Sequence, residues 1–249
     1  MKKKLLMVAG IVSYAGASYA QETDSVRHVY LQEVQVVSTR ASEKTPVAFS
    51  NLGKDQISKL NSGQDIPFLL TVTPSVVATS DAGTGIGYTG VRVRGTDATR
   101  INVTTNGVPM NDAESHTLYW VNMPDIASSV GDLQIQRGAG TSTNGGAAFG
   151  ASINMKTESL STAPYAEVSA SYGSFNTHKE VLKVGTGLLG GRWGFDARLS
   201  NIMSDGYIDR ASSDLKSYYV QGGKRTGYRN ICCFCCIWIC YTKYQIKSV

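Results

Sequence analysis

Apolar and polar residues alternate with a period of two through much of the second half of the chain. Three stretches between residues 166 and 199 do so, and their apolar members are Ala166, Val168, Ala170 and Tyr172, then Leu182, Val184 and Leu188, then Trp193, Phe195, Ala197 and Leu199. Each stretch is about ten residues long, which is the length and period of a membrane-crossing β-strand. A soluble antiparallel sheet alternates in the same way, so the pattern alone leaves both alternatives open. A fourth strand is expected from Lys216.

The first half of the chain has a different pattern, in which short strands alternate with short helices. Predicted helices lie at residues 51–60, 65–70 and 125–129, and predicted strands begin at Val76, Val91, Ile101 and Gly131. In the first helix Ile57 and Leu60 are three residues apart, which places them on one face. Asn106-Gly107 predicts a tight turn after the strand at Ile101. The sequence therefore predicts a small mixed α/β domain.

Residues 131–157 read as a strand, a glycine-rich loop and a second strand. Glycine lets backbones approach closely, so we expect this loop to be pressed against another surface. A phosphate-binding loop needs GxGxxG, or GxxxxGK followed by Ser or Thr, at the start of a helix. Thr143 stands where the third glycine would be, and no lysine follows a glycine before Lys156. A packed structural loop is the favoured interpretation.

Motifs occur in a recognisable order around this loop. They are Val91-Arg-Val-Arg-Gly95, then Ile101-Asn-Val-Thr-Thr-Asn106-Gly107-Val-Pro109, then Gln136-Arg137-Gly138 and the segment from Asn144 to Asn154. In order and spacing they resemble the plug domain of TonB-dependent outer-membrane receptors, over residues 31–157. Asn106 and Ala151 depart from the aspartate and the glycine that are usual in the family.

The resemblance implies an α+β fold, in which a small mixed α/β plug domain is followed by the first antiparallel strands of an incomplete transmembrane β-barrel. The expected organisation is a signal peptide (1–20), a flexible N-terminus with a TonB-box-like segment (21–42), the plug domain (43–157), the start of the barrel (158–225) and an aberrant Cys-rich tail (226–249). Three or four strands fall below the minimum of about eight for a closed barrel. We therefore expect the chain to be truncated.

The N-terminus has the pattern of a secretory signal. Lysines at positions 2–4 precede an apolar run from Leu5 to Tyr14, and small residues lead to a cleavage site after Ala20. The run is too short for a membrane anchor. Removing those three lysines from the net charge of +5 leaves +2, which does not indicate nucleic-acid binding. An outer-membrane location is expected, although a truncated product can remain periplasmic.

A short β-prone segment lies ahead of the predicted domain, formed by Glu33, Val34, Gln35, Val36, Val37 and Ser38. One interpretation makes it the first strand of the domain. The other makes it an energy-coupling segment that adds as a strand to the sheet edge of a partner. Its resemblance to a TonB box favours the second interpretation, and the implied partner is a TonB-type energy-transducing protein.

Acidic and aromatic side chains gather in two loops. Asp112, Glu114 and His116 alternate, which on an extended segment would put them on one side. A metal site is possible from such residues, but a solvated loop is favoured and no metal is expected. The resemblance implies instead that the two loops contact a substrate, through Asp81, Tyr88, Asp112, Glu114, His116, Tyr119 and Trp120.

Arg92, Arg94 and Arg137 lie beside glycines at strand ends. They are either surface charges or, as the resemblance implies, partners of carboxylates on the barrel wall that hold the plug in place. Removing one partner of such a buried pair costs about 3–5 kcal/mol.

All five cysteines lie between Cys232 and Cys240. A thiolate metal site is one interpretation, but adjacent cysteines cannot easily reach one ion, and zinc ligands normally come as spaced pairs. Exposed thiols are also prone to oxidation outside the cytoplasm. Out-of-frame translation or a sequencing error is the favoured explanation of the tail.

The sequence thus predicts part of a receptor that imports a scarce nutrient, with a ferric chelate as the first expectation, and outer-membrane lipid as a further partner. The alternative is a non-transporting plug fragment that acts as a periplasmic ligand-binding or TonB-binding module. Siderophore, ferric citrate, haem, cobalamin and glycan receptors share the motifs, so the substrate stays open. No cofactor is expected. No enzyme is expected either, since His28, His116 and His178 lie far apart and none is paired with Ser or Cys.

Overall fold

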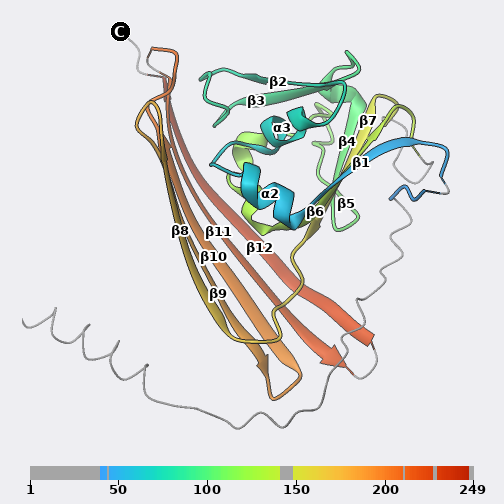
Figure 1. Ribbon diagram of the computed structural model, residues 1–249, viewed down its shortest axis with the longest axis vertical. Coiled ribbons are helices and arrows are strands. Elements are labelled where there is room, and N and C mark those ends of the chain that lie inside the picture. The colour runs from blue at the N-terminus through green and yellow to red at the C-terminus, as the bar shows by residue number, and fades with distance from the viewer. Residues whose placement is uncertain (1–39, 44, 141–147, 210, 227–228, 247–249) are drawn as a thin grey trace, which may run out of the picture. The chain divides into compact units, whose positions relative to one another are not determined.

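The computed structural model describes residues 40–43, 45–140, 148–209, 211–226 and 229–246, with side chains described as far as Lys224. Its strands form two five-stranded sheets and one two-stranded sheet. The first five-stranded sheet belongs to an N-terminal domain, residues 40–157, and the second, which we call the strand sheet, follows it in the chain (Figure 1). The predicted signal peptide and the coupling segment at residues 33–38 lie outside the described residues.

The N-terminal domain is the predicted small mixed α/β domain. Its elements are β1 (Ala48–Gly53), α2 (Lys54–Leu60), α3 (Ile66–Leu69), η1 (Leu70–Val72), β2 (Val76–Ser80), β3 (Thr89–Val93), η2 (Ala98–Arg100), β4 (Ile101–Thr105), β5 (Val108–Pro109), η3 (Trp120–Asn122), η4 (Ile126–Ser129), β6 (Val130–Arg137) and β7 (Ala151–Thr157). The first predicted helix is shorter than expected, because residues 51–53 complete β1. There the buried Leu52 pairs with Leu133 of β6, so the sheet takes these residues and the helix begins at Lys54.

The sheet of the N-terminal domain has the order β1-β6-β7-β4-β5. β6 and β7 are the two strands of the predicted strand–loop–strand stretch, and they pair antiparallel, whereas β4 and β7 pair parallel. Side chains from these three strands are at the centre of the domain's hydrophobic core, among them Ile101, Val103, Leu133, Ile135, Ile153 and Met155. At the end of β4, Asn106 and Gly107 have φ values of 53° and 85°, which confirms the predicted tight turn into β5.

The end of the glycine-rich loop is pressed against another backbone, as predicted. The Gly150 N–H donates to the Arg100 carbonyl over 3.0 Å. A Cβ at Gly150 would lie 2.8 Å from that same oxygen, so a larger residue does not fit without a shift. This contact seats the start of β7 beside β4. Residues 141–147 of the loop lie outside the described part of the chain.

The strand sheet has the order β12-β11-β10-β9-β8, so consecutive strands are neighbours throughout. Its strands are β8 (Tyr165–Gly173), β9 (Thr177–Leu189), β10 (Trp193–Ser204), β11 (Ala211–Thr226) and β12 (Arg229–Ile246), and every pair is antiparallel. The predicted alternating stretches therefore form strands, and the fourth begins at Ala211, earlier than Lys216. The backbone of the Cys-rich tail forms β12, which pairs with β11 from Arg229 to Ile246.

The two faces of the strand sheet have the opposite polarity to a water-soluble sheet. Apolar side chains of the alternating stretches are exposed, for example Val168 at 78% and Leu199 at 55%. Polar side chains on the other face are buried, including Lys179, Asp196, Arg198, Ser200 and Gln221. An apolar outer face and a polar inner face are characteristic of transmembrane β-strands. Within the described residues, no helix combines the length and the apolar character that crossing a membrane requires.

Candidate functional site: a buried ionic cluster between two sheets

A buried carboxylate of the N-terminal domain, Asp125, lies where that domain contacts the strand sheet. Asp125 follows Pro124 and has a φ of 54°, in the left-handed region that Asp tolerates better than most residues with a Cβ. Its carbonyl accepts a hydrogen bond from the Ser128 N–H over 3.1 Å, which closes the first turn of η4. The Ser128 hydroxyl donates to Asp125 Oδ1 over 2.6 Å. These local bonds fix the direction of the carboxylate.

Lys179 of β9 reaches the same carboxylate. Its Nζ lies 2.7 Å from Asp125 Oδ1, and it also donates to Asn61 Oδ1 over 2.8 Å and to Ser128 Oγ over 3.1 Å. A lysine ammonium has three hydrogens to donate, so all three are used. The side chains of Lys179 and Asp125 are 6% and 1% exposed. This pair joins β9 to η4 and to the end of α2.

β10 and β11 complete the cluster. Arg198 NH1 lies 3.5 Å from Asp125 Oδ2 and donates to the main-chain carbonyl of Asp125, while its NH2 donates to Ser217 Oγ over 3.3 Å. The Ser200 hydroxyl donates to Asp125 Oδ2 over 2.7 Å. We call these side chains the Asp125 cluster: Asn61, Asp125, Ser128, Lys179, Arg198, Ser200 and Ser217.

The charge of Asp125 depends on its two cationic neighbours. Burial alone would raise the pKa of this carboxyl, but the ammonium of Lys179 and the guanidinium of Arg198 outweigh burial, and the pKa lies below its ordinary value. Asp125 is therefore an anion between two cations. A buried cluster of this kind holds while it is complete, because the loss of one member leaves an uncompensated charge in a medium of low dielectric.

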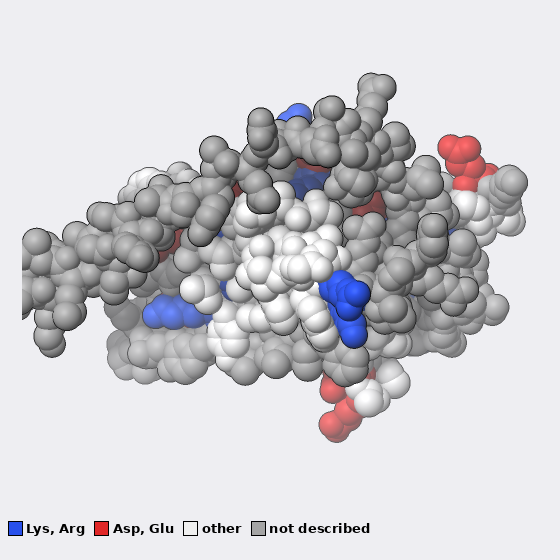
Figure 2. Space-filling model, turned by 90° about the horizontal axis from the view of Figure 1, so that it is seen from below, with Lys and Arg blue, Asp and Glu red and all other residues white. Residues whose placement is uncertain are grey.

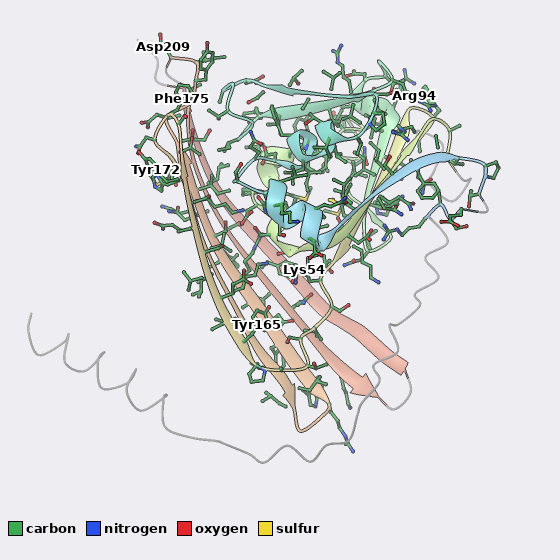
Figure 3. All side chains as sticks on the ribbon, in the orientation of Figure 1. Lys54, Arg94, Tyr165, Tyr172, Phe175 and Asp209 are labelled. Atoms are coloured by element: carbon green, nitrogen blue, oxygen red, sulfur yellow. The ribbon has the colours of Figure 1, made fainter. Side chains whose placement is uncertain are left out.

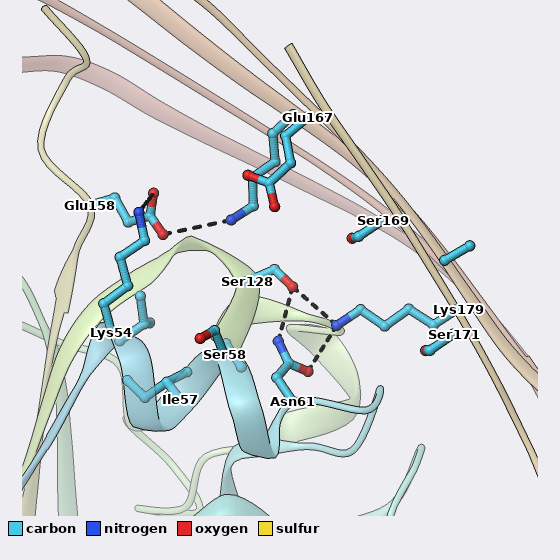
Figure 4. Close-up of a pocket in the computed structure, with 14 residues that line it drawn as sticks. Lys54, Ile57, Ser58, Asn61, Ser128, Glu158, Glu167, Ser169, Ser171 and Lys179 are labelled. Carbon is cyan, nitrogen blue, oxygen red and sulfur yellow. Dashed lines mark hydrogen bonds and ion pairs between the residues drawn. The ribbon is translucent and has the colours of Figure 1, made fainter. Parts of the chain in front are cut away.

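A cavity of about 220 Å³ lies beside the cluster, between α2 and strands β8 and β9 (Figure 4). Glu158, the first residue after β7, lines it, and its carboxylate lies 3.3 Å from Lys54 Nζ of α2 and 3.6 Å from Lys183 Nζ of β9. The wall on the strand side carries Glu167, Ser169 and Ser171 of β8. This part of the contact is polar and holds space, unlike the tightly bonded cluster next to it.

The three arginines expected to hold the domain in place lie elsewhere. Arg92 and Arg94 are exposed, and Arg137 donates to the Pro74 carbonyl over 3.2 Å, within its own domain. Figure 3 shows Arg94 well away from Tyr172 and Phe175 of the strand sheet. Among the described residues none of the three forms an ion pair with β8–β11. The polarity of the observed contact is the reverse of the expected one, since the domain supplies the carboxylate and the strands supply the cations.

The loop from Asp81 to Tyr88 contacts the strand sheet at a different place. The Asp81 N–H donates to the Tyr88 carbonyl over 3.0 Å, so the loop closes as a hairpin between β2 and β3. The Ala82 carbonyl accepts the Tyr207 N–H over 2.9 Å, from the segment that joins β10 to β11. Tyr207 in turn packs edge-on against Phe175, with 5.4 Å between ring centres. Asp81 and Tyr88 are both exposed beside this contact.

The second loop is a turn rather than an extended segment, so the argument that placed Asp112, Glu114 and His116 on one side of an extended chain does not apply. Asp112 Oδ2 accepts the N–H groups of Glu114 and Ser115, over 3.2 and 2.8 Å, and the His116 N–H donates to the Asp112 carbonyl over 3.0 Å. These bonds to the Ser115 and Glu114 backbone also lower the pKa of Asp112. The carboxylate is thus used within the turn.

The two aromatic residues after this turn have different environments. Tyr119 is 47% exposed, whereas Trp120 is 3% exposed and packs in the hydrophobic core of the domain. Among the described residues, no three His, Cys, Asp or Glu side chains gather closely enough to hold a metal ion. Seen from below, the described surface is mostly uncharged, with separate Lys and Arg side chains and a few Asp and Glu side chains towards its edges (Figure 2).

Comparison with known proteins supports what the fold indicates. The family model of the TonB-dependent receptor plug domain matches residues 41–152. These residues are a TonB-dependent receptor plug domain. No curated protein matches the sequence significantly.

Solved structures match both the plug domain and the strand sheet. The pyoverdine receptor FpvA of P. aeruginosa, in complex with a heterologous ferric pyoverdine, has a TM-score of 0.61 and 16% identity, and the match covers 74% of this chain and 24% of that one. The ferric yersiniabactin uptake receptor FyuA of Yersinia pestis has a TM-score of 0.58 and 14% identity, over 74% of this chain and 29% of FyuA. The copper transporter OprC has a TM-score of 0.58 and 16% identity, over 72% and 28%.

At this level of identity the likeness shows the fold: a plug domain followed by part of a barrel wall, as expected. The chain spans about a quarter of the length of the receptors it matches. The matched proteins are receptors and transporters rather than enzymes. Because the strands are wall strands, the Asp125 cluster is a contact between plug and wall.

Sequence reasoning missed the Asp125 cluster, although a signal was present. Lys179 and Arg198 lie on the polar faces of strands whose other faces are apolar. If the apolar faces point to lipid, such cations point inward, where the plug domain or the inner face of the wall itself must supply a carboxylate. Asp125 could not be selected from sequence, because nothing in its neighbourhood distinguishes it from the other acidic residues of the domain.

Proposed function

We propose that this chain supplies the plug domain and the first wall strands of an outer-membrane receptor that imports a scarce, bulky nutrient. A ferric chelate is the proposed substrate, since FpvA and FyuA are receptors for ferric chelates. The match to the copper transporter OprC makes another metal complex the nearest alternative. The exposed apolar face of β8–β11 would contact outer-membrane lipid.

The observation that carries this proposal is the Asp125 cluster. A plug domain must close the pore at rest and yield when transport occurs. Asp125 meets Lys179 and Arg198 at 2.7 and 3.5 Å in a site with almost no solvent exposure, so the closed arrangement is held by a few strong contacts. Such contacts act over short distances and are lost together when the plug domain moves. The Asp125 cluster would thus stabilise the closed state.

Substrate recognition is assigned to the two loops that the sequence indicated. Asp81 and Tyr88 are exposed beside Tyr207 and Phe175, so plug and wall offer a joint surface there. In the second loop, Glu114, His116 and Tyr119 are the proposed contacts. Asp112 would act by shaping its turn, and Trp120 by supporting the loop from the core.

Energy coupling is assigned to residues 33–38, which would add as a strand to the sheet of a TonB-type protein. Proline cannot donate to a strand ladder. In a complete receptor that carries this chain, Val36→Pro should therefore abolish binding of the partner and uptake of a radiolabelled ferric chelate by cells. Ser25→Pro, the same change outside the segment, is the matched control and should leave both intact.

Two results would contradict the proposal. Unchanged uptake in the Val36→Pro receptor would refute the coupling role. The alternative of a periplasmic binding module would be favoured by two observations together. The chain would bind ligand in a form that never enters the outer membrane, and no complete receptor that carries it would take the ligand up.

A further inference from the structure

The polypeptide is held to β6 where it first joins the plug domain. The Ala41 N–H donates to Gln134 Oε1 over 2.8 Å, and Gln134 Nε2 donates to the Ala41 carbonyl over 2.9 Å. The side-chain amide thus makes the same pair of bonds that a neighbouring strand would make. Both residues are buried, Ala41 at 7% and Gln134 at 2% exposed.

A second contact is made two residues earlier in β6, on the same face of the strand. The Arg40 guanidinium forms an ion pair with Asp132, and residues 132 and 134 point to the same side because a strand alternates with a period of two. Gln134 is oriented by two further bonds, to Asn51 Oδ1 over 2.8 Å and from Gln136 Nε2 over 2.9 Å. We call the two contacts, Arg40 with Asp132 and Ala41 with Gln134, the β6 clamp.

The position of the β6 clamp determines which bonds a pull on the N-terminus would load. β1 begins at Ala48, opposite Arg137, and runs back until Asn51 lies opposite Gln134. The chain therefore passes Gln134 twice, first at Ala41 and again at Asn51. A pull applied ahead of Arg40 meets the clamp before it reaches β1, which among the described strands is the edge of the sheet and pairs with β6 alone.

Opening of the clamp would release slack before β1 is loaded. Ala41 and Ala48 are seven residue steps apart, which is about 23–25 Å in a fully extended chain. Part of that length is already spanned, because Ala41 lies at Gln134 and Ala48 at Arg137 of β6, so roughly 20 Å is the upper limit of this slack. The load would then arrive at Ala48, and the β1–β6 pairs would open one after another from that end. An edge strand opened in this way separates at lower force than one whose pairs are loaded together.

We propose that the β6 clamp is the first load-bearing contact between the N-terminal segment and the plug domain, and that it sets the pull needed before β1 detaches. The source of the pull rests on the proposed function, since only Thr39 lies between the coupling segment and Arg40. The clamp itself is a property of this chain and can be tested without a partner or a substrate.

Hydrogen exchange of the full chain in detergent tests whether the clamp is closed in solution. In Gln134→Leu the Ala41 amide loses its acceptor, so it should exchange at least about tenfold faster than in the unmodified chain. Asn111→Leu is the matched control, because Asn111 makes the same kind of paired contact, with the Val103 N–H over 2.7 Å and the Ile101 carbonyl over 2.8 Å. It should expose the Val103 amide and leave Ala41 unchanged. Equal exchange of Ala41 in all three chains would overturn the clamp.

Single-molecule stretching between tags at the two termini tests whether the clamp bears load. The unmodified chain should show an early step of at most about 20 Å, and this step should vanish or move to lower force in Gln134→Leu. Arg40→Ala should lower the force of the same step. Because the Arg40 side chain is partly exposed, this variant tests the clamp even if Gln134→Leu fails to fold. An early step that is identical in all chains would refute the proposal. Loss of uptake has no bearing on this result, so the two proposals fail independently.

Discussion

Replacement of Asp125 by asparagine is the most direct test of the plug–wall contact. The change keeps the size of the side chain and one acceptor oxygen, but it removes the charge between Lys179 and Arg198. Their side chains stay buried, at 6% and 2% exposed, with no anion to compensate them. Removing one partner of a buried pair costs about 3–5 kcal/mol. Since asparagine can still accept one hydrogen bond, we expect a value near the lower limit, which is a factor of roughly a hundred in the equilibrium between attached and detached plug domain.

The assay is hydrogen exchange of the full chain in detergent, read at the amides of η4, which become exposed when the plug domain separates from β9 and β10. The Ser128 amide is the best reporter, because its acceptor is the Asp125 carbonyl itself. Lys216→Gln is the control: Lys216 pairs with Asp214 over 3.6 Å at a side chain that is 57% exposed. Exposed pairs contribute only about 0–1 kcal/mol, so exchange in η4 should stay close to that of the unmodified chain.

The double variant Asp125→Asn with Lys179→Gln separates a charge effect from a general loss of packing. If the cost comes from an uncompensated cation, removing Lys179 as well should recover part of the protection that Asp125→Asn loses. The decisive comparison is between the Asp125→Asn chain and the Lys216→Gln chain. If the η4 amides exchange no faster in the first than in the second, the cluster is not the contact that holds the plug domain.

Other features of the plug domain, and the segment between β10 and β11, give further predictions. Burial raises the pKa of Asp65 to about 8, although the Thr89 hydroxyl donates to this carboxyl over 2.8 Å. The folded state therefore binds the proton of Asp65 more tightly than the unfolded state does. The contribution of Asp65 to stability should be greatest below pH 4 and should decrease as pH rises towards about 8. Asp65→Asn should remove this decrease in denaturant titrations between pH 4 and pH 8, and an unaltered slope over that range would contradict it. Gly150→Ala should lower the free energy of unfolding by about 1–3 kcal/mol, because its Cβ would press on the Arg100 carbonyl, and an unchanged denaturant midpoint would show that the loop adjusts. Gly206 has a φ of +82°, and in Gly206→Ala the new Cβ would press against the Ala211 backbone. The change should move the segment that carries Tyr207 and speed exchange of the Tyr207 amide, which donates to the Ala82 carbonyl. Unaltered exchange would show that the conformation at Gly206 does not control this contact.

The elements of this fold follow from local patterns more closely than their assembly does. Alternation in the second half of the chain predicts β8 to β10, and Asn106-Gly107 predicts the turn into β5, because both signals depend on neighbouring residues. The parallel pairing of β4 with β7 has no such signal, since it joins strands that are distant in the sequence. β12 could not be predicted either, because the Cys-rich composition of residues 226–249 does not indicate a further strand of the sheet.

The candidate site shows a similar division. The hairpin from Asp81 to Tyr88 was predicted as a loop and does lie beside the wall strands. Trp120 was grouped with the exposed Tyr119, because a single sequence does not reveal which of two adjacent aromatic residues faces the core. The contacts expected for Arg92, Arg94 and Arg137 were transferred from a resemblance and stay a prediction, since the described strands form only part of a wall. The contact that the structure does show is made by a carboxylate of the domain, Asp125. Ionic contacts between elements distant in sequence depend on side-chain direction at both ends, and that direction is set by packing.

The reversed faces of the strand sheet affect how this protein must be handled. In an ordinary domain, water drives apolar side chains inward and so favours the native arrangement. Here the row formed by Val168, Leu182, Val184 and Leu199 points outward, and plain buffer would favour any association that covers it. Detergent or lipid is therefore part of the folding conditions rather than an additive, and stability measured without it would report on self-association.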